Sequence, residues 1–443
     1  MVNRRQFLLG ATALAFLGLT RTALGEIKSH SHIFGALKTD PKQLLDLPDG
    51  FSYRVISELG APMSDGLAVP DRADGMGCIG LDTQRVALVR NHELHPKHLS
   101  KQPQALQMYR SENAYDTFRD GVALPGGTTT IIYNTKTGNV EREFVSLIGT
   151  IRNCAGGITP WNSWLSCEET VMRPDSMIGQ DHGYIFEVPA SANAPVQPVP
   201  LKAMGRFNHE AAAVDPKTGY VYLTEDRHDS LFYRFIPNEY GHLAAGGQLQ
   251  ALVIKSKPQF DTRNWQSASM PVFGTYDVEW VNLDNPESPD DDLRYQGYEK
   301  GAALFARGEG IHWGEDECYF CCTNGGALKH GQIMRYQPSI ANKDQGQISL
   351  FFESDDPNMY DFGDNLTVTP QGHLLVCEDQ SGNNQDNHLR WVTPTGQAHA
   401  FAHLHADTEL AGACFSPDGQ TLFVNIYSPT KTLAITGPWD EVL

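Results

Sequence analysis

The chain has 443 residues, of which 40% are hydrophobic and 20% charged, a composition that excludes a disordered chain and allows a large buried core. It carries 53 acidic against 34 basic residues, and this net charge of −19 argues against binding to nucleic acid or anionic lipid, which require clustered cations. Its 41 glycines and 26 prolines favour many short strands joined by turns over a helical bundle.

Residues 1–25 have the features of a twin-arginine signal peptide. Arg4 and Arg5 precede an apolar stretch, and the small residue Gly25 suits cleavage by signal peptidase. The apolar stretch is shorter than the roughly 20 residues that span a bilayer, so a membrane anchor is the less favoured alternative. We therefore expect export by the twin-arginine machinery, to the periplasm or beyond, and one mature domain over residues 26–443. Because this route carries folded proteins, it is compatible with a metal cofactor loaded before export.

One pattern recurs along the mature chain: a short apolar run, a polar turn, a second apolar run and a cluster of acids or amides. The six turns are marked by Asp82, Pro160, Asp215, Glu315, Pro370 and Pro417. Where the spacing is regular it is roughly 50 residues, which is typical of the blades of a β-propeller. We predict an all-β fold, a six-bladed β-propeller, with loop insertions near 96–120 and 255–301. A two-sheet sandwich array is the alternative.

The irregular spacing of the eight cysteines indicates buried thiols rather than a disulfide framework. Cys318, Cys321 and Cys322 resemble half of a zinc knuckle, but they lie in an apolar run and have no second ligand pair. A strand in the protein core is therefore favoured over a zinc site at these three residues.

Acids and amides stand at both ends of the paired apolar runs, where the inner strands of a propeller gather around its axis. Before the first strands of the repeats stand Asn153-Cys154, His209-Glu210, Arg307-Gly308-Glu309, Asp364-Asn365 and Glu409. After the second strands stand Asn91-His92-Glu93, Cys167-Glu168-Glu169, Glu225-Asp226-Arg227, Thr323-Asn324 and Glu378-Asp379. We expect these side chains to converge at one end of the axis, unless they only cap strands at a solvated rim.

Converging carboxylates repel one another and are costly to desolvate unless metal ions compensate them. Carboxylate and amide oxygens suit calcium, whereas Cys167, beside two glutamates, offers a soft ligand to a transition metal such as iron. The pattern therefore predicts a metal site on the axis.

Seven ordered motifs carry a resemblance to a known family: the runs 153–161, 164–169, 208–210, 223–227, 307–310, 377–379 and 434–439. They resemble the PhoX family of exported alkaline phosphatases. The resemblance implies a six-bladed propeller whose iron (Fe³⁺) and calcium (Ca²⁺) ions, bridged by oxide, hydrolyse phosphate monoesters and release inorganic phosphate.

The same resemblance implies roles for individual residues. Cys167 is expected to bind iron together with carboxylates among Glu210, Glu309 and Asp379. Four further glutamates are expected near the calcium ions: Glu168, Glu169, Glu93 and Glu378. Arg307, with Arg227 as the second candidate, is expected to face the phosphate, and the alternative role of Arg307 is an ion pair that holds Glu309.

Metal ions at such a site would position the ester, stabilise charge in the transition state and supply an oxide or hydroxide nucleophile. Two other functions fit a propeller with axial metals. One is a calcium-dependent esterase or lactonase, against which Cys167 argues, and the other is a binding protein whose metals are structural.

Overall fold

The computed structural model describes residues 33–98, 112–380 and 385–441. The predicted signal peptide at 1–25 lies outside the described residues, as does the middle of the predicted insertion at 96–120. None of the described helices is long and apolar enough to cross a membrane. In the part of the chain that the structure describes, α2 (Leu293–Glu299) is the one α-helix.

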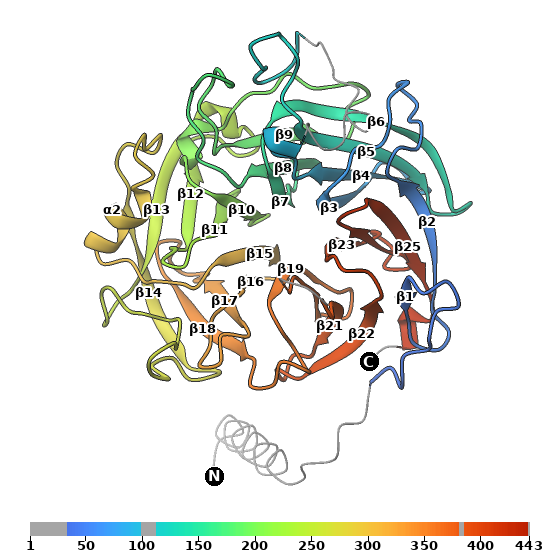
Figure 1. The fold of residues 1–443 in the computed structure, drawn as a ribbon. Helices are drawn as coiled ribbons and strands as arrows, with labels where there is room; N and C mark the ends of the chain where they lie inside the picture. The colour runs from blue at the N-terminus through green and yellow to red at the C-terminus, as the bar shows by residue number, and fades with distance from the viewer. Residues whose placement is uncertain (1–32, 99–111, 381–384, 442–443) are drawn as a thin grey trace, which may run out of the picture.

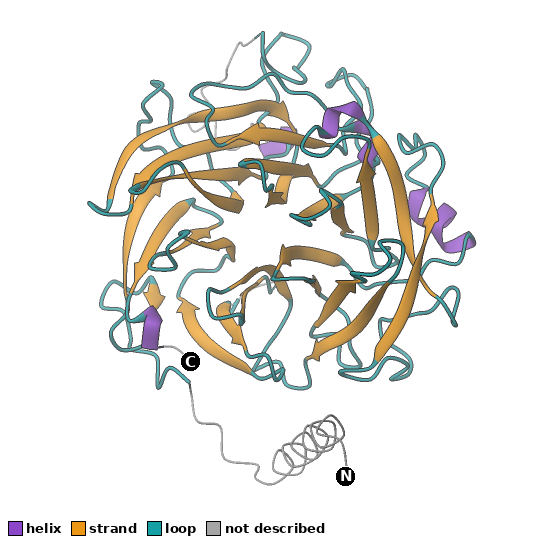
Figure 2. Ribbon diagram, turned by 180° about the vertical axis from the view of Figure 1, so that it is seen from behind, coloured by secondary structure: helices purple, strands orange, loops and turns teal. Residues whose placement is uncertain are grey.

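The strands of the described residues form five antiparallel sheets in a propeller-like arrangement around a central axis (Figures 1 and 2). The first sheet in chain order contains β3 (Ala73–Gly80), β4 (Arg85–His92), β5 (Gly126–Asn134) and β6 (Asn139–Thr150). The second contains β7 (Asn153–Ile158), β8 (Ser163–Glu168) and β9 (Ile185–Pro189). The prediction of an all-β fold is confirmed, and the arrangement differs from the alternative of a sandwich array.

The largest sheet has nine strands and joins two four-stranded units. One unit contains β10 (His209–Val214), β11 (Val221–Glu225), β12 (Tyr233–Pro237) and β13 (Gly247–Ile254). The other contains β15 (Gly308–Trp313), β16 (Cys318–Cys322), β17 (Gln332–Pro338) and β18 (Gly346–Glu353). Strand β14 (Thr275–Asn282) pairs with both β13 and β18. The predicted insertion at 255–301 is therefore not only loop, because it contains β14 and α2.

Two strands from the N-terminal part of the chain complete the C-terminal sheets. Strand β1 (Leu45–Asp46) pairs with the last strand of the sheet formed by β19 (Gly363–Val368), β20 (Leu374–Glu378), β21 (His388–Val392) and β22 (Ala398–Leu404). Strand β2 (Ser52–Glu58) pairs with the last strand of the sheet formed by β23 (Leu410–Phe415), β24 (Leu422–Ile426) and β25 (Lys431–Thr436). Segments from the two ends of the chain are thus tied together, which closes the ring of sheets.

Six strands lie innermost, and each contacts the next around the axis: β3, β7, β10, β15, β19 and β23, with β23 returning to β3. Each of them pairs with the strand that follows it, and near its start each has a break in pairing register. A break of this kind is a β-bulge, which turns a side chain out of the regular alternation. The first residue inside each break is Asp74, Cys154, Glu210, Glu309, Asp364 or Gly412.

The sixth of these equivalent positions requires glycine. Gly412 has a φ of +61°, and a Cβ atom placed on it would lie 2.4 Å from the backbone oxygen of Asp74. The close approach of β23 to β3 therefore explains why this bulge carries no side chain.

Hydrophobic side chains fill the spaces between neighbouring sheets. The largest cluster surrounds the β15–β18 unit and includes Cys318 and Cys322, which are fully buried. All eight cysteines are buried with free thiols, as the sequence predicts, and the run 318–322 is a core strand rather than a zinc knuckle.

Candidate metal centre

The bulge residues of the inner strands converge with acids from the neighbouring loops. Their ligand atoms form three groups, each with atoms within 4.8 Å of one another: Cys154, Glu169 and Glu210; Glu210, Glu309 and Asp364; and Asp364, Asp379 and Glu409. Because Glu210 and Asp364 each belong to two groups, the three are continuous. We call these seven residues, together with Asp74, the axial cluster.

Burial makes the axial cluster costly to ionise without cations. The pKa of Glu210 is raised well above its usual value, first by burial and then by the nearby carboxylates of Glu309 and Asp364. The pKa of Asp364 is shifted in the same direction, to about 7, by burial and then by Asp379. Burial and the same kind of repulsion raise the pKa of Asp74 well above its usual range. The electrostatics of the site thus favour bound cations, which would stabilise the ionised carboxylates.

Unpaired oxygen atoms in the axial cluster also indicate that it binds cations. Both carboxylate oxygens of Glu210 and Oδ1 of Asp74 are buried and have no hydrogen-bond partner among the described residues. A buried acceptor without a donor or a cation is strongly disfavoured. Several carboxylate oxygens and one thiol converging in this way are a donor set that fits oxygen-ligated calcium and a softer transition metal such as iron.

Two arginines flank the axial cluster. Nε of Arg307 donates to Asp226 Oδ1 at 2.7 Å, and Nη2 donates to Glu309 Oε1 at 2.7 Å. Arg152 makes an equivalent pair of contacts, because its Nε donates to Glu93 Oε1 at 2.6 Å and its Nη2 forms an ion pair with Glu169. Each arginine therefore joins an acid of the cluster to an acid outside it.

The backbone at these arginines is unusual. Arg307 and Arg152 both have a φ of +49°, and Arg72 has one of +56°. Each of the three directly precedes an innermost strand. Such conformations cost about 1–2 kcal/mol in a non-glycine residue and concentrate at functional sites. Phe362, which directly precedes β19, has the same conformation with a φ of +50°, so the conformation belongs to the entry into these innermost strands rather than to arginine alone.

Five of the predicted ligands lie in or beside the axial cluster. Glu169, Glu210, Glu309 and Asp379 belong to it. Glu93 lies next to it, joined to Glu169 through Arg152, and accepts a hydrogen bond from the hydroxyl of Tyr427. The structure thus brings together carboxylates that are far apart in the sequence.

Cys167 does not lie in the axial cluster, which corrects the expectation that it supplies the sulfur ligand. Its side chain packs in a hydrophobic cluster with Leu165 and Ile185, and burial alone, without a charged neighbour, raises its pKa. Cys154 lies in the axial cluster instead, with Sγ 3.5 Å from Asp74 Oδ2. The sulfur ligand that the sequence assigns to Cys167 is therefore available from Cys154.

Glu168 and Glu378 also lie outside the cluster. Both end the second strand of a repeat, and both have carboxylates that are satisfied by protein donors. Glu168 accepts hydrogen bonds from the backbone N–H groups of Ile151 and Gly183 at 2.9 and 2.8 Å and contacts His182 Nδ1 at 2.6 Å. Glu378 accepts from Arg390 Nε at 2.7 Å and from the N–H group of Asp361 at 2.8 Å. These glutamates hold loops together rather than offer free oxygens.

Arg227 lies near Arg307 but has other partners. Its backbone oxygen accepts a hydrogen bond from the Arg307 N–H group at 2.9 Å, while its Nη2 donates to Asn208 Oδ1 and Asp291 Oδ2, both at 3.1 Å. Arg227 is thus placed to support Arg307 from the adjacent loop.

Five residues of the site are not among the predicted ones: Asp74, Cys154, Asp364, Glu409 and Arg152. Three of them stand in the polar runs that precede the first strands of the repeats, and Arg152 precedes Asn153-Cys154 as Arg307 precedes Gly308-Glu309. These runs are the signal that could have found them. Asp74 is the exception, because two glycines and a methionine separate it from the apolar run that begins at Cys78.

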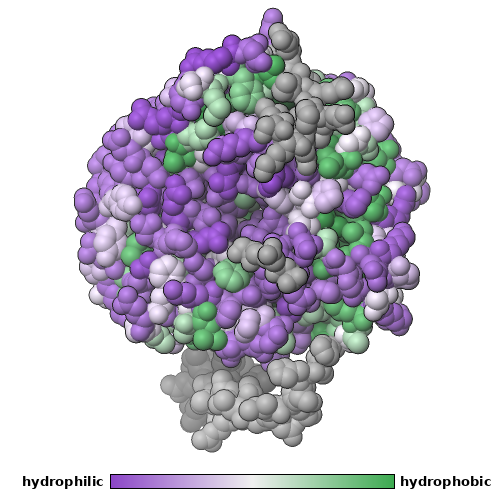
Figure 3. Space-filling view, in the orientation of Figure 1, coloured by the Kyte–Doolittle hydropathy of each residue, from purple (hydrophilic) through white to green (hydrophobic). Residues whose placement is uncertain are grey.

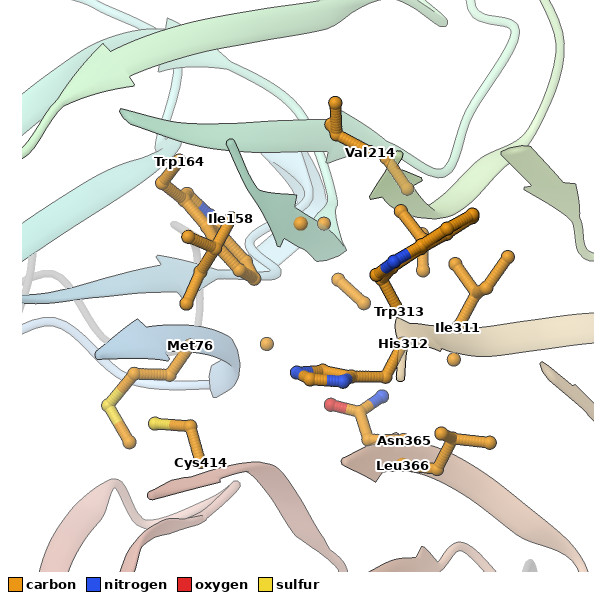
Figure 4. Close-up of a pocket in the computed structure, with 18 of the residues that line it drawn as sticks. Met76, Ile158, Trp164, Val214, Ile311, His312, Trp313, Asn365, Leu366 and Cys414 are labelled. Atoms are coloured by element: carbon orange, nitrogen blue, oxygen red, sulfur yellow. The ribbon is translucent and has the colours of Figure 1, made fainter. Parts of the chain in front are cut away.

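The face of the molecule shown in Figure 3 is mainly hydrophilic around a hollow at the centre of the ring. A separate pocket lies farther along the inner strands, toward their C-terminal ends (Figure 4). Its described lining is mostly apolar, with Met76, Ile158, Trp164 and Ile311, and none of it carries a carboxylate, lysine or arginine. This pocket therefore has neither the carboxylates that bind metal ions nor the basic side chains that bind anions.

Comparisons with known proteins identify the family and the fold of the chain. The chain matches the family described as alkaline phosphatase PhoX over residues 32–430. Its fold is similar to Pseudomonas fluorescens PhoX in complex with vanadate, a transition state analogue, with a TM-score of 0.69 and 19% identity, covering 91% of this chain and 97% of that one. A gluconolactonase from Xanthomonas campestris matches with a TM-score of 0.41 and 11% identity, covering 87% of this chain and 95% of that one. No curated protein matches the chain. The match over residues 32–430 shows that the chain belongs to the PhoX family of alkaline phosphatases, which are phosphoric monoester hydrolases.

Proposed function

We propose that this protein is a metal-dependent phosphatase that hydrolyses small phosphate monoesters at the axial cluster and releases inorganic phosphate. The observation that carries the proposal is the convergence of buried carboxylates and one thiol, with both oxygens of Glu210 unpaired, beside two arginines. A phosphate dianion is repelled by bare carboxylates, so the site requires cations before it can bind this substrate.

The donor atoms suggest how the metals divide. Cys154, with Glu169 and Glu210, supplies the sulfur that suits iron. The group of Asp364, Asp379 and Glu409 supplies only oxygen and suits calcium. Ions held by these residues would polarise phosphoryl oxygens and would make water more acidic.

Arg307 is the residue that we propose contacts the phosphoryl group. Asp226 and Glu309 engage its Nε and Nη2 atoms, which fixes the plane of the guanidinium group. Nη1 has no hydrogen bond to a described residue, so its two N–H groups are available to phosphoryl oxygens. Both roles predicted for Arg307, the ion pair with Glu309 and the contact with phosphate, are compatible in this arrangement. Arg227 remains the second candidate.

We also propose that the propeller has six blades, which the ring of six innermost strands supports. For residues 1–25 we propose twin-arginine export to the periplasm or beyond, on the sequence pattern alone.

The phosphatase proposal is tested by hydrolysis of p-nitrophenyl phosphate with and without a calcium chelator, together with elemental analysis for iron and calcium on the same sample. We expect chelator-sensitive turnover and both metals. Glu210→Gln should lower turnover at least about 100-fold, the scale at which transition-state charge stabilisation is lost. The variant Glu315→Gln, at an exposed glutamate, should behave as wild type.

Two other results would contradict the proposal. Bound metals with hydrolysis of p-nitrophenyl acetate but not of the phosphate would indicate an esterase. Bound metals without turnover of either compound would indicate a binding protein with structural ions.

A further inference from the structure

A second group of metal-ligating side chains lies away from the axis, on the outer strands of the β19–β22 sheet. We propose that Asp46, His403 and His405 bind one divalent transition-metal ion, with zinc as the representative ion. The proposal does not depend on the phosphatase function, because it involves none of the residues of the axial cluster. Its basis is the placement of the three side chains by strand pairing and the chemistry of their donor atoms.

Strand register brings the three side chains to one face. Asp46 in β1 is paired directly with His403 in β22. Side chains opposite each other on antiparallel strands lie with their Cβ atoms about 5 Å apart. His405 is two residues beyond His403, so the two histidines share a face. The N–H group of His405 donates to the backbone oxygen of Leu44 at 3.0 Å, which continues the pairing.

The donor atoms already meet at the Asp46 carboxylate. His405 Nε2 lies 2.7 Å from Asp46 Oδ1, and His403 Nδ1 lies 3.5 Å from Asp46 Oδ2. One donor atom from each residue lies within 4.8 Å of the other two. Ligands about 2.1 Å from a tetrahedral zinc ion lie about 3.4 Å apart, so small side-chain rotations are sufficient for binding.

The surroundings hold these ligands in orientation. Asp46 Oδ1 accepts a hydrogen bond from the backbone N–H group of Asp40 at 2.7 Å. The second ring nitrogen of His403, Nε2, lies 2.9 Å from Asp386 Oδ1. In protein zinc sites, a histidine that binds the metal through one ring nitrogen usually donates a hydrogen bond to a carboxylate through the other. The ring of His388 stacks on that of His403, with centroids 4.7 Å apart, and so restricts its rotation.

The partial exposure of the two histidines and the charge around Asp46 are also compatible with a bound cation. The side chains of His403 and His405 are 26% and 27% exposed, which leaves room for an ion to enter and for a water molecule to complete its coordination. Asp46 has two histidine partners and, among the described residues, no ion pair with lysine or arginine. A cation is therefore not excluded by an existing positive charge.

The alternative group of Asp386, His388 and His403 is less suitable. Nδ1 of His388 lies 2.8 Å from the backbone oxygen of Asp386, which engages it as a donor. In either group an ion would replace an existing contact, that of His403 Nε2 with Asp386 here and that of His405 Nε2 with Asp46 in the other group. The Asp46 group has no contact of a histidine ring nitrogen with a backbone oxygen among the described residues.

Ligand chemistry separates this site from the axial cluster. Imidazole nitrogen selects transition metals over calcium, and two of the three proposed ligands are imidazoles. The three metal-ligating groups of the axial cluster contain carboxylates and a thiol but no histidine. Zinc bound at Asp46, His403 and His405 is therefore recognisable by its nitrogen ligands even when the axial cluster holds other ions.

Such an ion would join the N-terminal strand β1 to the C-terminal part of the chain. Asp46 and His405 are separated by 359 positions in the sequence. A link between distant segments that forms only in the folded state stabilises that state. We therefore expect zinc to raise the melting temperature of the protein through this site.

The test compares untagged wild-type protein with the double variant His403→Asn/His405→Asn. Zinc is titrated in competition with a chromophoric chelator, and the bound ion is examined by X-ray absorption at the zinc edge. Wild type should bind one more zinc ion than the double variant, with two imidazole nitrogens, and should melt at a higher temperature when zinc is added. His242→Asn, at an exposed histidine paired with Glu239, is the matched control and should behave as wild type.

Equal zinc binding by wild type and the double variant, or bound zinc without imidazole ligands, would overturn the proposal. Asp46→Asn provides a second test if the double variant does not fold, since an amide oxygen can still accept from Asp40 but the anionic ligand is removed. In that variant zinc affinity should fall at least about tenfold, and unchanged affinity would also overturn the proposal.

Discussion

In the metal-free protein, the free energy of unfolding should decrease as the pH rises from about 4 to 7. Asp364 shows the reason. In the metal-free site burial, followed by repulsion from Asp379, raises its pKa from 3.8 to about 7. The folded state therefore holds a proton that the unfolded state releases between these two values, and stability present below pH 4 is lost as the pH rises through 7. Three pKa units correspond to about 4 kcal/mol, the upper limit for this one carboxyl.

The assay is urea unfolding of chelator-treated protein at pH 5 and pH 8, followed by tryptophan fluorescence. Asp364→Asn removes the titrating group while keeping its size, so the variant should lose less stability than wild type between the two pH values. Between pH 5 and pH 8 the loss of unfolding free energy should be about 3 kcal/mol larger in wild type than in Asp364→Asn. The rest of the effect of this carboxyl lies below pH 5. Asp407→Asn, at an exposed carboxylate, is the control and should match wild type.

Metal-loaded protein should not show this loss, because bound cations stabilise the ionised carboxylates. An identical decrease in stability for wild type and Asp364→Asn would refute the argument. So would a metal-free wild type that is more stable at pH 8 than at pH 5.

Three further sets of substitutions separate the roles of buried groups. Cys154→Ser should lose bound metal, measured by elemental analysis, and its turnover should fall at least about 100-fold. Cys167→Ser should keep its metal and its turnover, but its free energy of unfolding in urea should fall by about 1–3 kcal/mol. Arg307→Lys should raise KM for p-nitrophenyl phosphate about tenfold, because lysine cannot hold Asp226 and phosphate together. Glu168→Gln should lower the free energy of unfolding by about 1–3 kcal/mol through its buried hydrogen bonds, with turnover per folded molecule unchanged.

The sequence predicts the inner hairpins well because each has a clear physical pattern. Two apolar runs joined by a polar turn form a hairpin, which buries both of its faces when its sheet packs between two others, as β7 and β8 do around Pro160. Strand β14 was missed for the opposite reason. Only Val278 among its eight residues is buried, so its sequence is polar enough to look like a loop.

Several carboxylates named from the sequence lie together in the candidate site, but the thiol grouped with them is Cys154 and not Cys167. Glu210 and Glu309 were found because acids stand just before an apolar run. The exchange of Cys154 for Cys167 has a geometrical cause. The bulge at the start of β7 turns Cys154 to the axis, while regular alternation along β8 sends Cys167 to the core beside Leu165. A break in register is a property of two paired strands, so one strand's sequence does not reveal it.

The pairing of charges inside the site is itself an argument for external cations. Arg152 and Arg307 each join one acid of the cluster, Glu169 or Glu309, to an acid at its periphery. At the centre, both oxygens of Glu210 are left without a donor among the described residues. A fold that only had to neutralise its own acids would place an arginine at a fully buried carboxylate such as Glu210, where an unpaired charge is costly. Since the arginines instead hold the surrounding acids in place, the central oxygens are arranged for ions that the chain itself does not supply.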